Sequence, residues 1–265
     1  MNSLESPNVL LRAWKLSERW SIGMKRLRIA VTVVAVAMLT YGCAKESGSP
    51  FGQSKVDLTK KFAPFSSDSK SVASTVPAPP AVDPQAPDQF LVRFKTTKGD
   101  FVAQINRQWS PKGADRFYNM AKVDYFNDIA IFRAVPNFMF QFGLHGNPDV
   151  NSDWAEARFE DDQPVGISNL PGTLCFAKTG QPNSRSVQMF VNLGQNIPLD
   201  GQGFTPFGKV IEGMDVVRAI NTEYGENPGR EDVQGRLKRE GNDYILKRFP
   251  RIDLIRSVEL IQPNG

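Results

Sequence analysis

FRAVPNFMFQFG, residues 132–143, is the part of the sequence that decides the fold. It spans parts of two short apolar runs, residues 129–135 and 138–144, which are separated by Pro136 and Asn137. Short apolar runs bounded by Pro or Asn are typical of β-strands. The stretch therefore predicts two strands, and Arg133 and Gln141 are polar residues within them.

The same strand pattern continues on both sides of this stretch. Apolar residues alternate at positions 90, 92 and 94 and again at 101, 103 and 105, on either side of Thr97-Lys98-Gly99-Asp100. This alternation predicts a β-hairpin. Further strands are expected at residues 173–177, 187–192, 206–211 and 253–261.

Two helices are expected among these strands. Ser110 offers a side-chain oxygen as an N-cap, and Pro111 suits the first turn of a helix whose apolar face runs to Ala121. The second helix has apolar residues at positions 214, 217 and 220. Many short strands, two helices and no regular strand–helix alternation predict a mainly β fold, a closed antiparallel barrel with helical caps.

The distribution of charge argues against nucleic-acid binding. The chain of 265 residues has a net charge of +4, and residues 1–43 alone hold six Lys or Arg and two Glu. The net charge of residues 44–265 is therefore zero. Phosphate binding requires a clustered excess of Lys and Arg, which the main body lacks at the level of net charge.

Histidine and cysteine are too few for several common sites. With one histidine, His145, a metal site built from two or more histidines is excluded within one chain. The two cysteines, Cys43 and Cys175, lie in segments of different character and predict no disulfide framework. We interpret His145 as a solvated turn residue, and Cys175 as a buried small apolar residue.

An export signal is expected near the N-terminus. Lys25, Arg26 and Arg28 precede an apolar run of eleven residues, 29–39. As a helix this run would span roughly 16 Å, about half of a bilayer core, so it suits a signal peptide better than a membrane span. A buried core helix is the alternative. Translation could start at Met1 or at Met24.

Gly42-Cys43 resembles the end of a bacterial lipobox, in which the cysteine is lipidated and becomes the mature N-terminus. Thr40 and Tyr41 depart from that motif, which usually has Leu and a small residue there. Plain cleavage after Ala44 is the alternative. Both outcomes place the domain outside the cytoplasm. Lipidation of Cys43 predicts a lipoprotein anchored at the periplasmic face of the cell envelope.

The chain divides into three parts. Residues 1–43 are the N-terminal extension and export signal. Residues 44–88 are rich in Ser, Pro and Ala and include VPAPPAVDPQAP at 76–87, a composition that predicts a disordered, extended linker. Residues 89–265 form the folded domain.

Three ordered blocks of this domain resemble cyclophilins. FRAVPNFMFQFG is close to their signature F-H-R-[IV]-[IV]-P-G-F-M-x-Q-G-G, and the blocks at residues 171–192 and 199–217 resemble two further family blocks. The resemblance covers nearly all of residues 89–261. It implies a closed, eight-stranded antiparallel β-barrel capped by two α-helices, and a peptidyl-prolyl cis-trans isomerase that needs no cofactor and no metal.

The sequence also departs from the family pattern. Phe132 replaces the usual His and Asn137 the usual Gly. The pocket Trp of many eukaryotic members would align near Pro198 and is absent, which predicts weak binding of cyclosporin. Residues 225–251 form a longer segment than minimal cyclophilins have.

The chemistry of isomerisation suggests which residues act. Rotation about an X-Pro bond is slow because amide resonance sets a barrier of about 18–20 kcal/mol. A catalyst must stabilise the twisted amide, whose nitrogen regains its lone pair, and a fixed donor cation can do so. We assign this role to Arg133, which stays charged and offers five N–H donors, with Gln141 as its orienting partner.

The resemblance implies the substrate-binding residues. Those expected to line the proline pocket are Phe138, Met139, Phe190, Leu199 and Phe204. Gln188 and the backbone of Ala177 and Lys178 are expected to bind the peptide that precedes the proline. Simple core packing is the alternative for the apolar residues, and a solvated surface position is the alternative for Arg133.

The expected function is therefore the acceleration of X-Pro rotation in exported or envelope proteins, which assists their folding. The expected partners are proline-containing polypeptides and, through the lipid on Cys43, a membrane. A peptide-binding scaffold with weak or no activity is the alternative, as is a chaperone that acts through the linker and the C-terminal extension.

Overall fold

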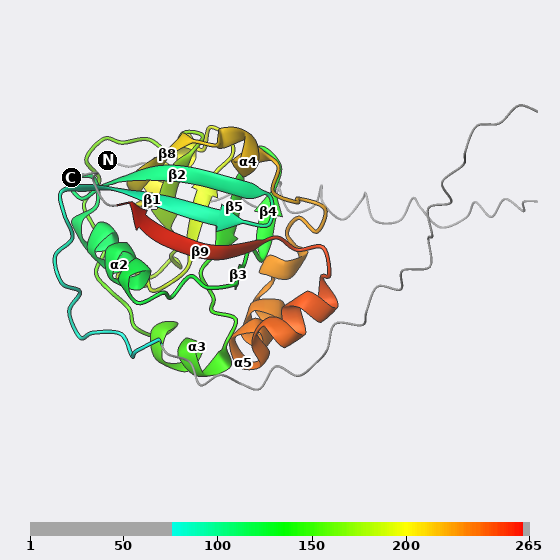
Figure 1. Cartoon of the computed structure of the whole chain (residues 1–265). Coiled ribbons are helices and arrows are strands. Elements are labelled where there is room, and N and C mark those ends of the chain that lie inside the picture. The colour runs from blue at the N-terminus through cyan, green and yellow to red at the C-terminus, as the bar shows by residue number, and fades with distance from the viewer. Residues whose placement is uncertain (1–75, 262–265) are drawn as a thin grey trace, which may run out of the picture. The chain divides into compact units, whose positions relative to one another are not determined.

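The structure, a computed structural model, describes residues 76–261. Nine strands in this part of the chain form one antiparallel sheet. They are β1 (Gln89–Thr96), β2 (Gly99–Asn106), β3 (Ile129–Ala130), β4 (Arg133–Val135), β5 (Met139–Phe142), β6 (Thr173–Phe176), β7 (Met189–Asn192), β8 (Pro206–Glu212) and β9 (Leu254–Ile261). Their order is β3-β9-β1-β2-β8-β6-β7-β5-β4, and β2, β1 and β9 lie side by side in Figure 1.

The mainly β, antiparallel fold is confirmed, with two differences of detail. The predicted strand at residues 129–135 is divided, because β3 pairs with β9 whereas β4 pairs with β5. The sheet therefore has nine strands rather than eight. β3 and β4 are its two ends, and within residues 76–261 no ladder joins them, so the sheet is strongly curled without complete closure into a barrel.

Four α-helices lie in the described part of the chain. They are α2 (Pro111–Lys122), α3 (Pro148–Trp154), α4 (Met214–Arg218) and α5 (Glu231–Arg248), and two short 3-10 turns are η2 (Ile197–Gln202) and η3 (Asn227–Gly229). Helices α2 and α4 are the two predicted ones. Helices α3 and α5 were not predicted, and they pack against each other (Figure 1). Gly241 kinks α5 with a φ of 63°, a conformation that glycine adopts readily.

Ser110 occupies the predicted N-cap position of α2, but its side chain does not cap the helix. Ser110 makes no capping hydrogen bond, because its hydroxyl donates instead to Asp162. The carboxylate of Asp162 accepts from the backbone N–H groups of Lys112 and Gly113, each over 3.0 Å. A side chain far along the chain thus satisfies the N–H groups at the start of α2, while Pro111 occupies the first turn as predicted.

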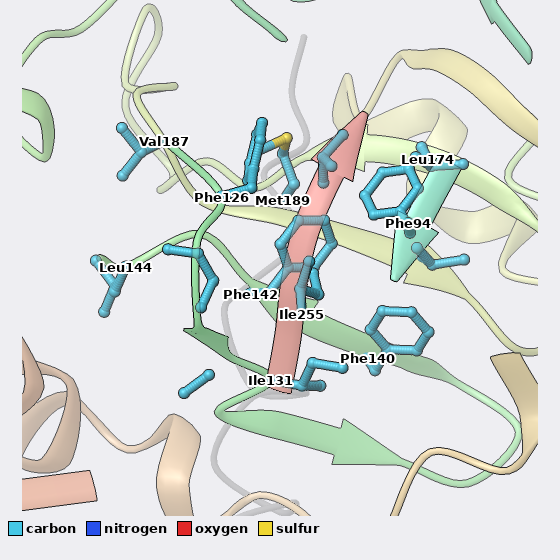
Figure 2. Packing of buried hydrophobic residues seen from close by; sticks show 14 of the residues in the cluster. Phe94, Phe126, Ile131, Phe140, Phe142, Leu144, Leu174, Val187, Met189 and Ile255 are labelled. Atoms are coloured by element: carbon cyan, nitrogen blue, oxygen red, sulfur yellow. The ribbon is translucent and has the colours of Figure 1, made fainter. Parts of the chain in front are cut away.

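Most of the largest buried side chains are aromatic, and Figure 2 shows Phe94, Phe126 and Phe142 among the aliphatic residues of the core. Phe94 of β1 stacks on Phe101 of β2 with ring centroids 4.5 Å apart, and it meets the edge of Phe142 at 6.2 Å. Phe140 and Phe142 point into this core, whereas Met139 belongs to a second, smaller buried cluster. Strand β5 thus directs Phe140 and Phe142 into the main core, and the alternating residue Met139 into the smaller cluster on its other face.

Residues 76–88, predicted as the end of the linker, contact the folded domain. Asp83 pairs with the buried Arg116 of α2 at 2.6 Å, and Trp154 of α3 donates to the carbonyl of Pro77 over 2.7 Å. This part of the predicted linker is therefore ordered. The export signal, Cys43 and the rest of the linker lie outside the described residues, so the domain boundaries stay predictions. In the described range, the helices are too short or too polar to cross a bilayer.

Candidate functional site

The ten predicted site residues lie together. Nine of them line a cavity of about 140 Å³, namely Arg133, Phe138, Met139, Gln141, Ala177, Lys178, Phe190, Leu199 and Phe204. The tenth, Gln188, lines an adjoining polar cavity of about 210 Å³. The two cavities share Gln141, Ala177 and Lys178. Segments that are distant in sequence, from β4 to the loop after η2, thus meet at one site.

Apolar side chains form the floor and walls of the first cavity. Met139 and Phe190 are buried with Cys175 in a small cluster, separate from the main core. Phe138, Leu199 and Phe204 are only partly buried against this cluster, and the ring of Phe204 meets the edge of Phe190 at 5.8 Å. These side chains therefore line an opening and do not merely fill the core. Such a surface suits a small apolar ring.

Cys175 lies beneath this cavity as a free, fully buried thiol. Burial raises the pKa of the thiol well above its ordinary value, and the charge of Asp200 adds to that effect. Its Sγ donates to Oδ1 of Asn169 over 3.0 Å. The interpretation of Cys175 as a buried, unreactive residue agrees with this environment.

Arg133 and Gln141 are paired across the β4–β5 hairpin. Nη1 of Arg133 donates to Oε1 of Gln141 over 3.1 Å, and Nε2 of Gln141 donates to Oε1 of Gln188 over 2.8 Å. The side chain of Arg133 is only 25% exposed, and its guanidinium carbon lies 5.6 Å from the centre of the Phe138 ring. Arg133 is therefore held at the rim of the cavity, and the alternative of a solvated surface position does not describe it.

Glu226 is part of the site and was missed by sequence reasoning. Its Oε2 accepts from Nε of Arg133 over 2.6 Å, and its Oε1 accepts from Nη2 over 2.9 Å. The carbonyl of Gly225 also accepts from the backbone N–H of Ala134, next to Arg133. No sequence signal could have identified Glu226, because it lies in the long segment to which no pattern assigned a role.

A buried polar network behind the cavity was also missed. Nδ2 of Asn196 donates to the carbonyl of Phe138 over 2.7 Å, and Nδ2 of Asn169 donates to the carbonyl of Phe204 over 2.8 Å. Nδ2 of Asn169 also donates to Oδ1 of Asp200 in η2 over 2.7 Å. The network therefore fixes the loops that carry Phe138, Leu199 and Phe204. Burial opposes ionisation of Asp200, but the hydrogen bonds from Asn169 lower its pKa on balance.

Lys178 is restrained by a carboxylate. Its Nζ lies 3.3 Å from Oδ2 of Asp161, which also accepts from the backbone N–H of Asn183 over 3.0 Å. Burial alone would raise the pKa of Asp161, but these two donors lower it. The ammonium of Lys178 is thereby held against Asp161 at the edge shared by the two cavities.

Asn137 occupies the position where the family signature usually has glycine. Its φ is 57°, in the left-handed region that asparagine tolerates better than most residues with a side chain. The backbone turn between β4 and β5 is therefore kept. The departure from the signature at this position leaves the spacing of Arg133 and Gln141 unchanged.

The interpretation of His145 as solvated is wrong. The residue is only 7% exposed, and burial lowers its pKa to about 4. Its Nδ1 accepts from the backbone N–H of Asn147 over 2.9 Å, and its backbone N–H donates to Oδ1 of Asn151 over 2.8 Å. His145 lines neither cavity of the site. It is a structural residue beneath α3.

Comparisons with known proteins find similar sequences and a similar fold. Residues 91–240 match the family model described as Cyclophilin type peptidyl-prolyl cis-trans isomerase/CLD. The chain is 32% identical over 134 residues to a peptidyl-prolyl cis-trans isomerase of Acinetobacter baylyi, which covers 49% of this chain and 71% of that protein. It is 27% identical over 164 residues to peptidyl-prolyl cis-trans isomerase B of Escherichia coli, covering 59% of this chain and 96% of the relative.

A solved structure shows the same fold. It is the crystal structure of a cyclophilin type peptidyl-prolyl cis-trans isomerase of Cryptosporidium parvum, with a TM-score of 0.50 and 18% sequence identity. The match covers 66% of this chain and 99% of that one. The shared fold thus extends over nearly the full length of that protein.

Proposed function

Since the chain belongs to the cyclophilin-type peptidyl-prolyl cis-trans isomerase family and is an enzyme of that class, we propose that Arg133 is its catalytic residue and that exported proteins are its substrates. The observation that carries the first proposal is the position of the guanidinium. It lies at the rim of an apolar cavity and is held by Gln141 and Glu226.

The hydrogen bonds of Arg133 leave donors for a substrate. A guanidinium has five N–H groups. Two of them are bonded to Glu226 and one to Gln141, so in the described part of the chain two remain. With the proline ring in the cavity, a remaining N–H points at the amide nitrogen once rotation has freed its lone pair. The planar amide offers no such lone pair, so the interaction favours the twisted state.

Substrate binding is divided between the two cavities. The proline ring would lie against Met139 and Phe190, where burial of apolar surface favours binding. The residues that precede the proline would lie in the polar cavity along Gln188. Since one part of the peptide is held by the apolar cavity, the rest can rotate about the X-Pro bond relative to it. No covalent step is involved.

Action on exported proteins is proposed from the leader sequence. The basic cluster at residues 25–28, the apolar run at 29–39 and Gly42-Cys43 support export and attachment of a lipid to Cys43. A lipid and the part of the predicted linker that precedes residue 76 would hold the domain near the membrane surface, where newly exported chains emerge. Substrates would then be proline-containing segments of envelope proteins.

The test of location is membrane fractionation of cells that make the full chain. Wild-type protein should sediment with membranes, and the Cys43→Ser variant should be released into the soluble exported fraction. Soluble wild-type protein that begins at Lys45 would overturn the proposed anchor but would still support export.

The test of Arg133 is isomerisation of a short Ala-Pro peptide, measured by a protease-coupled assay or by NMR exchange.

A further inference from the structure

The catalytic arginine is held by a residue from the long segment before α5. Glu226 accepts two hydrogen bonds from Arg133, at 2.6 Å to Nε and 2.9 Å to Nη2. We propose that Glu226 is a positioning residue of this isomerase, which fixes the orientation of the Arg133 guanidinium toward the peptide bond. The proposal rests on the proposed catalytic role of Arg133.

The geometry of the pair is that of an orienting contact. Two parallel hydrogen bonds to one carboxylate fix the plane of the guanidinium, which a single contact cannot do. Gln141 accepts from the remaining nitrogen, Nη1, over 3.1 Å. Each of the three guanidinium nitrogens therefore has a hydrogen-bond partner, and rotation about the last side-chain bonds is restricted.

The aliphatic stem of Arg133 is fixed from the same segment. A methyl group built on Gly229 would lie 2.6 Å from Cδ, 2.9 Å from Cγ and 3.0 Å from Cβ of Arg133. The backbone of η3 therefore packs directly on the stem. Glu226 and Gly229 are separated by one turn, and the N–H of Gly229 donates to the carbonyl of Glu226 over 3.0 Å. One short turn thus contacts both the head and the stem of the arginine.

Glu226 lies outside the space that a substrate would occupy. It lines neither of the two cavities, and its side chain is 60% exposed whereas that of Arg133 is 25% exposed. The carboxylate therefore holds the guanidinium from the solvent side and does not compete with a peptide for the cavity. Because water and salt screen an exposed pair, its effect on the rate should be moderate and should depend on ionic strength.

The experiment compares Glu226→Gln and Glu226→Ala with the wild-type full chain, purified in detergent. Glu223→Gln is the matched control. Glu223 lies three residues earlier in the same segment and pairs with Arg251 through both carboxylate oxygens, without contacting Arg133. The Glu223→Gln substitution therefore removes the same kind of surface ion pair as the Glu226 variants do. Isomerisation of an Ala-Pro peptide gives kcat and KM for each variant.

We expect the Glu226 variants to lower kcat by about two- to fivefold with little change in KM, because a worse-oriented arginine binds the planar peptide as before. The loss should be greater for Ala than for Gln, which retains one acceptor. In 1 M salt the wild-type kcat should approach that of Glu226→Gln. Glu223→Gln should match wild type.

A second readout does not depend on turnover. The Nε–Hε signal of Arg133 in a ¹⁵N–¹H spectrum can be assigned from its loss in Arg133→Lys. It should move and exchange faster with water in Glu226→Gln and stay in place in Glu223→Gln. Unchanged or increased kcat in both Glu226 variants, or an equal loss in Glu223→Gln, would overturn the proposal. If instead the Arg133→Ala variant retains full turnover, the catalytic role of Arg133 fails, while the NMR signal still reports whether Glu226 holds it.

Discussion

Arg133 and Gln141 face each other as directly paired residues of β4 and β5, with Nη1 of Arg133 3.1 Å from Oε1 of Gln141. Directly opposite residues on one face of an antiparallel pair have Cβ atoms about 4.5–5.5 Å apart, so the register alone brings these two side chains together. A slip of one residue would place them on opposite faces. Strand pairing thus sets the contact before any ligand is present.

The first prediction separates catalysis from packing. Arg133→Ala should lower turnover of an Ala-Pro peptide by one to several orders of magnitude, since each ~1.4 kcal/mol of lost transition-state stabilisation is a factor of ten. The fold should survive, because the pair with the exposed Glu226 contributes at most about 1 kcal/mol to stability. Peptide turnover and Tm measured on the same sample check both statements.

Phe190→Ala is the contrasting variant. The ring of Phe190 is 5% exposed, so its removal should cost about 3–5 kcal/mol of unfolding free energy and lower Tm clearly. Tm should therefore separate the two variants. Arg133→Ala loses turnover with little loss of stability, whereas Phe190→Ala loses stability together with part of the surface that binds proline. Unfolding of Arg133→Ala, or full turnover in a well-folded Arg133→Ala domain, would contradict the catalytic assignment and favour the scaffold alternative.

The second prediction concerns the turn that packs on Arg133. Gly229→Ala places a methyl group 2.6 Å from Cδ of Arg133, so the arginine stem or η3 must move. We expect a loss of kcat with a small change in Tm, because the contact lies at the rim of the site and outside the main core. Steady-state kinetics and thermal unfolding of the full chain measure the two effects.

Gly235→Ala is the control for this variant. Its new methyl group would lie 3.4 Å from Nη1 of Arg239, at the end of a flexible side chain, so the substitution fits. Alanine also has the higher helix propensity inside α5, by about 1 kcal/mol. Turnover should match wild type and Tm should be equal or higher. Equal kinetics in the two glycine variants would show that the stem of Arg133 needs no support from η3.

The sequence predicts those parts of the site that depend on local pattern and family motif. The strands and family blocks that carry Arg133, Gln141 and the apolar residues of the cavity can be recognised in the sequence. The structure brings these residues together. Glu226 is different. It reaches Arg133 across 93 positions of the chain, and a single exposed glutamate has no periodicity or spacing that marks it.

The same reasoning explains the errors in the fold. Ser110 occupies the N-cap position, but its hydroxyl donates a hydrogen bond to Asp162, 52 residues away, and Asp162 accepts from the first N–H groups of α2 instead. His145 lies between glycines and was interpreted as solvated, yet α3 and Tyr125 cover it. Local propensity does not describe contacts with residues elsewhere in the chain, and here the contacts with Asp162 and Tyr125 determine the outcome.

The third prediction concerns inhibitors. The family resemblance attributes part of the contact with cyclosporin to a tryptophan that would align near Pro198. The tryptophans of the described residues, Trp109 and Trp154, do not line the cavity. We therefore expect cyclosporin to bind this chain more weakly than a family member with that tryptophan, measured by calorimetric titration of both. Equally tight binding would show that the alignment around η2 is wrong.

The fourth prediction concerns stability in mild acid. Burial lowers the pKa of His145 to about 4, whereas an unfolded histidine titrates near 6.5. Between these values the unfolded chain binds a proton that the folded chain does not, so folding stability is fully present above pH 6.5 and falls as the pH drops. The free energy of unfolding should fall by about 3 kcal/mol near pH 4. About half of that loss falls between pH 7 and pH 5, where urea unfolding can measure it.

His145→Asn identifies the group responsible. Its side-chain oxygen can accept from the N–H of Asn147 two residues later, as Nδ1 of His145 does, but it does not titrate. The variant should be less stable at pH 7, because the imidazole no longer fills its place, and its stability should change little between pH 7 and pH 5. Since His145 is the only histidine of the chain, other side chains contribute little in this window.

Turnover of folded wild-type enzyme should stay constant over the same range, because Arg133 remains charged. A wild-type stability that is flat from pH 7 to pH 5, or an unchanged slope in His145→Asn, would show that His145 is not the titrating group.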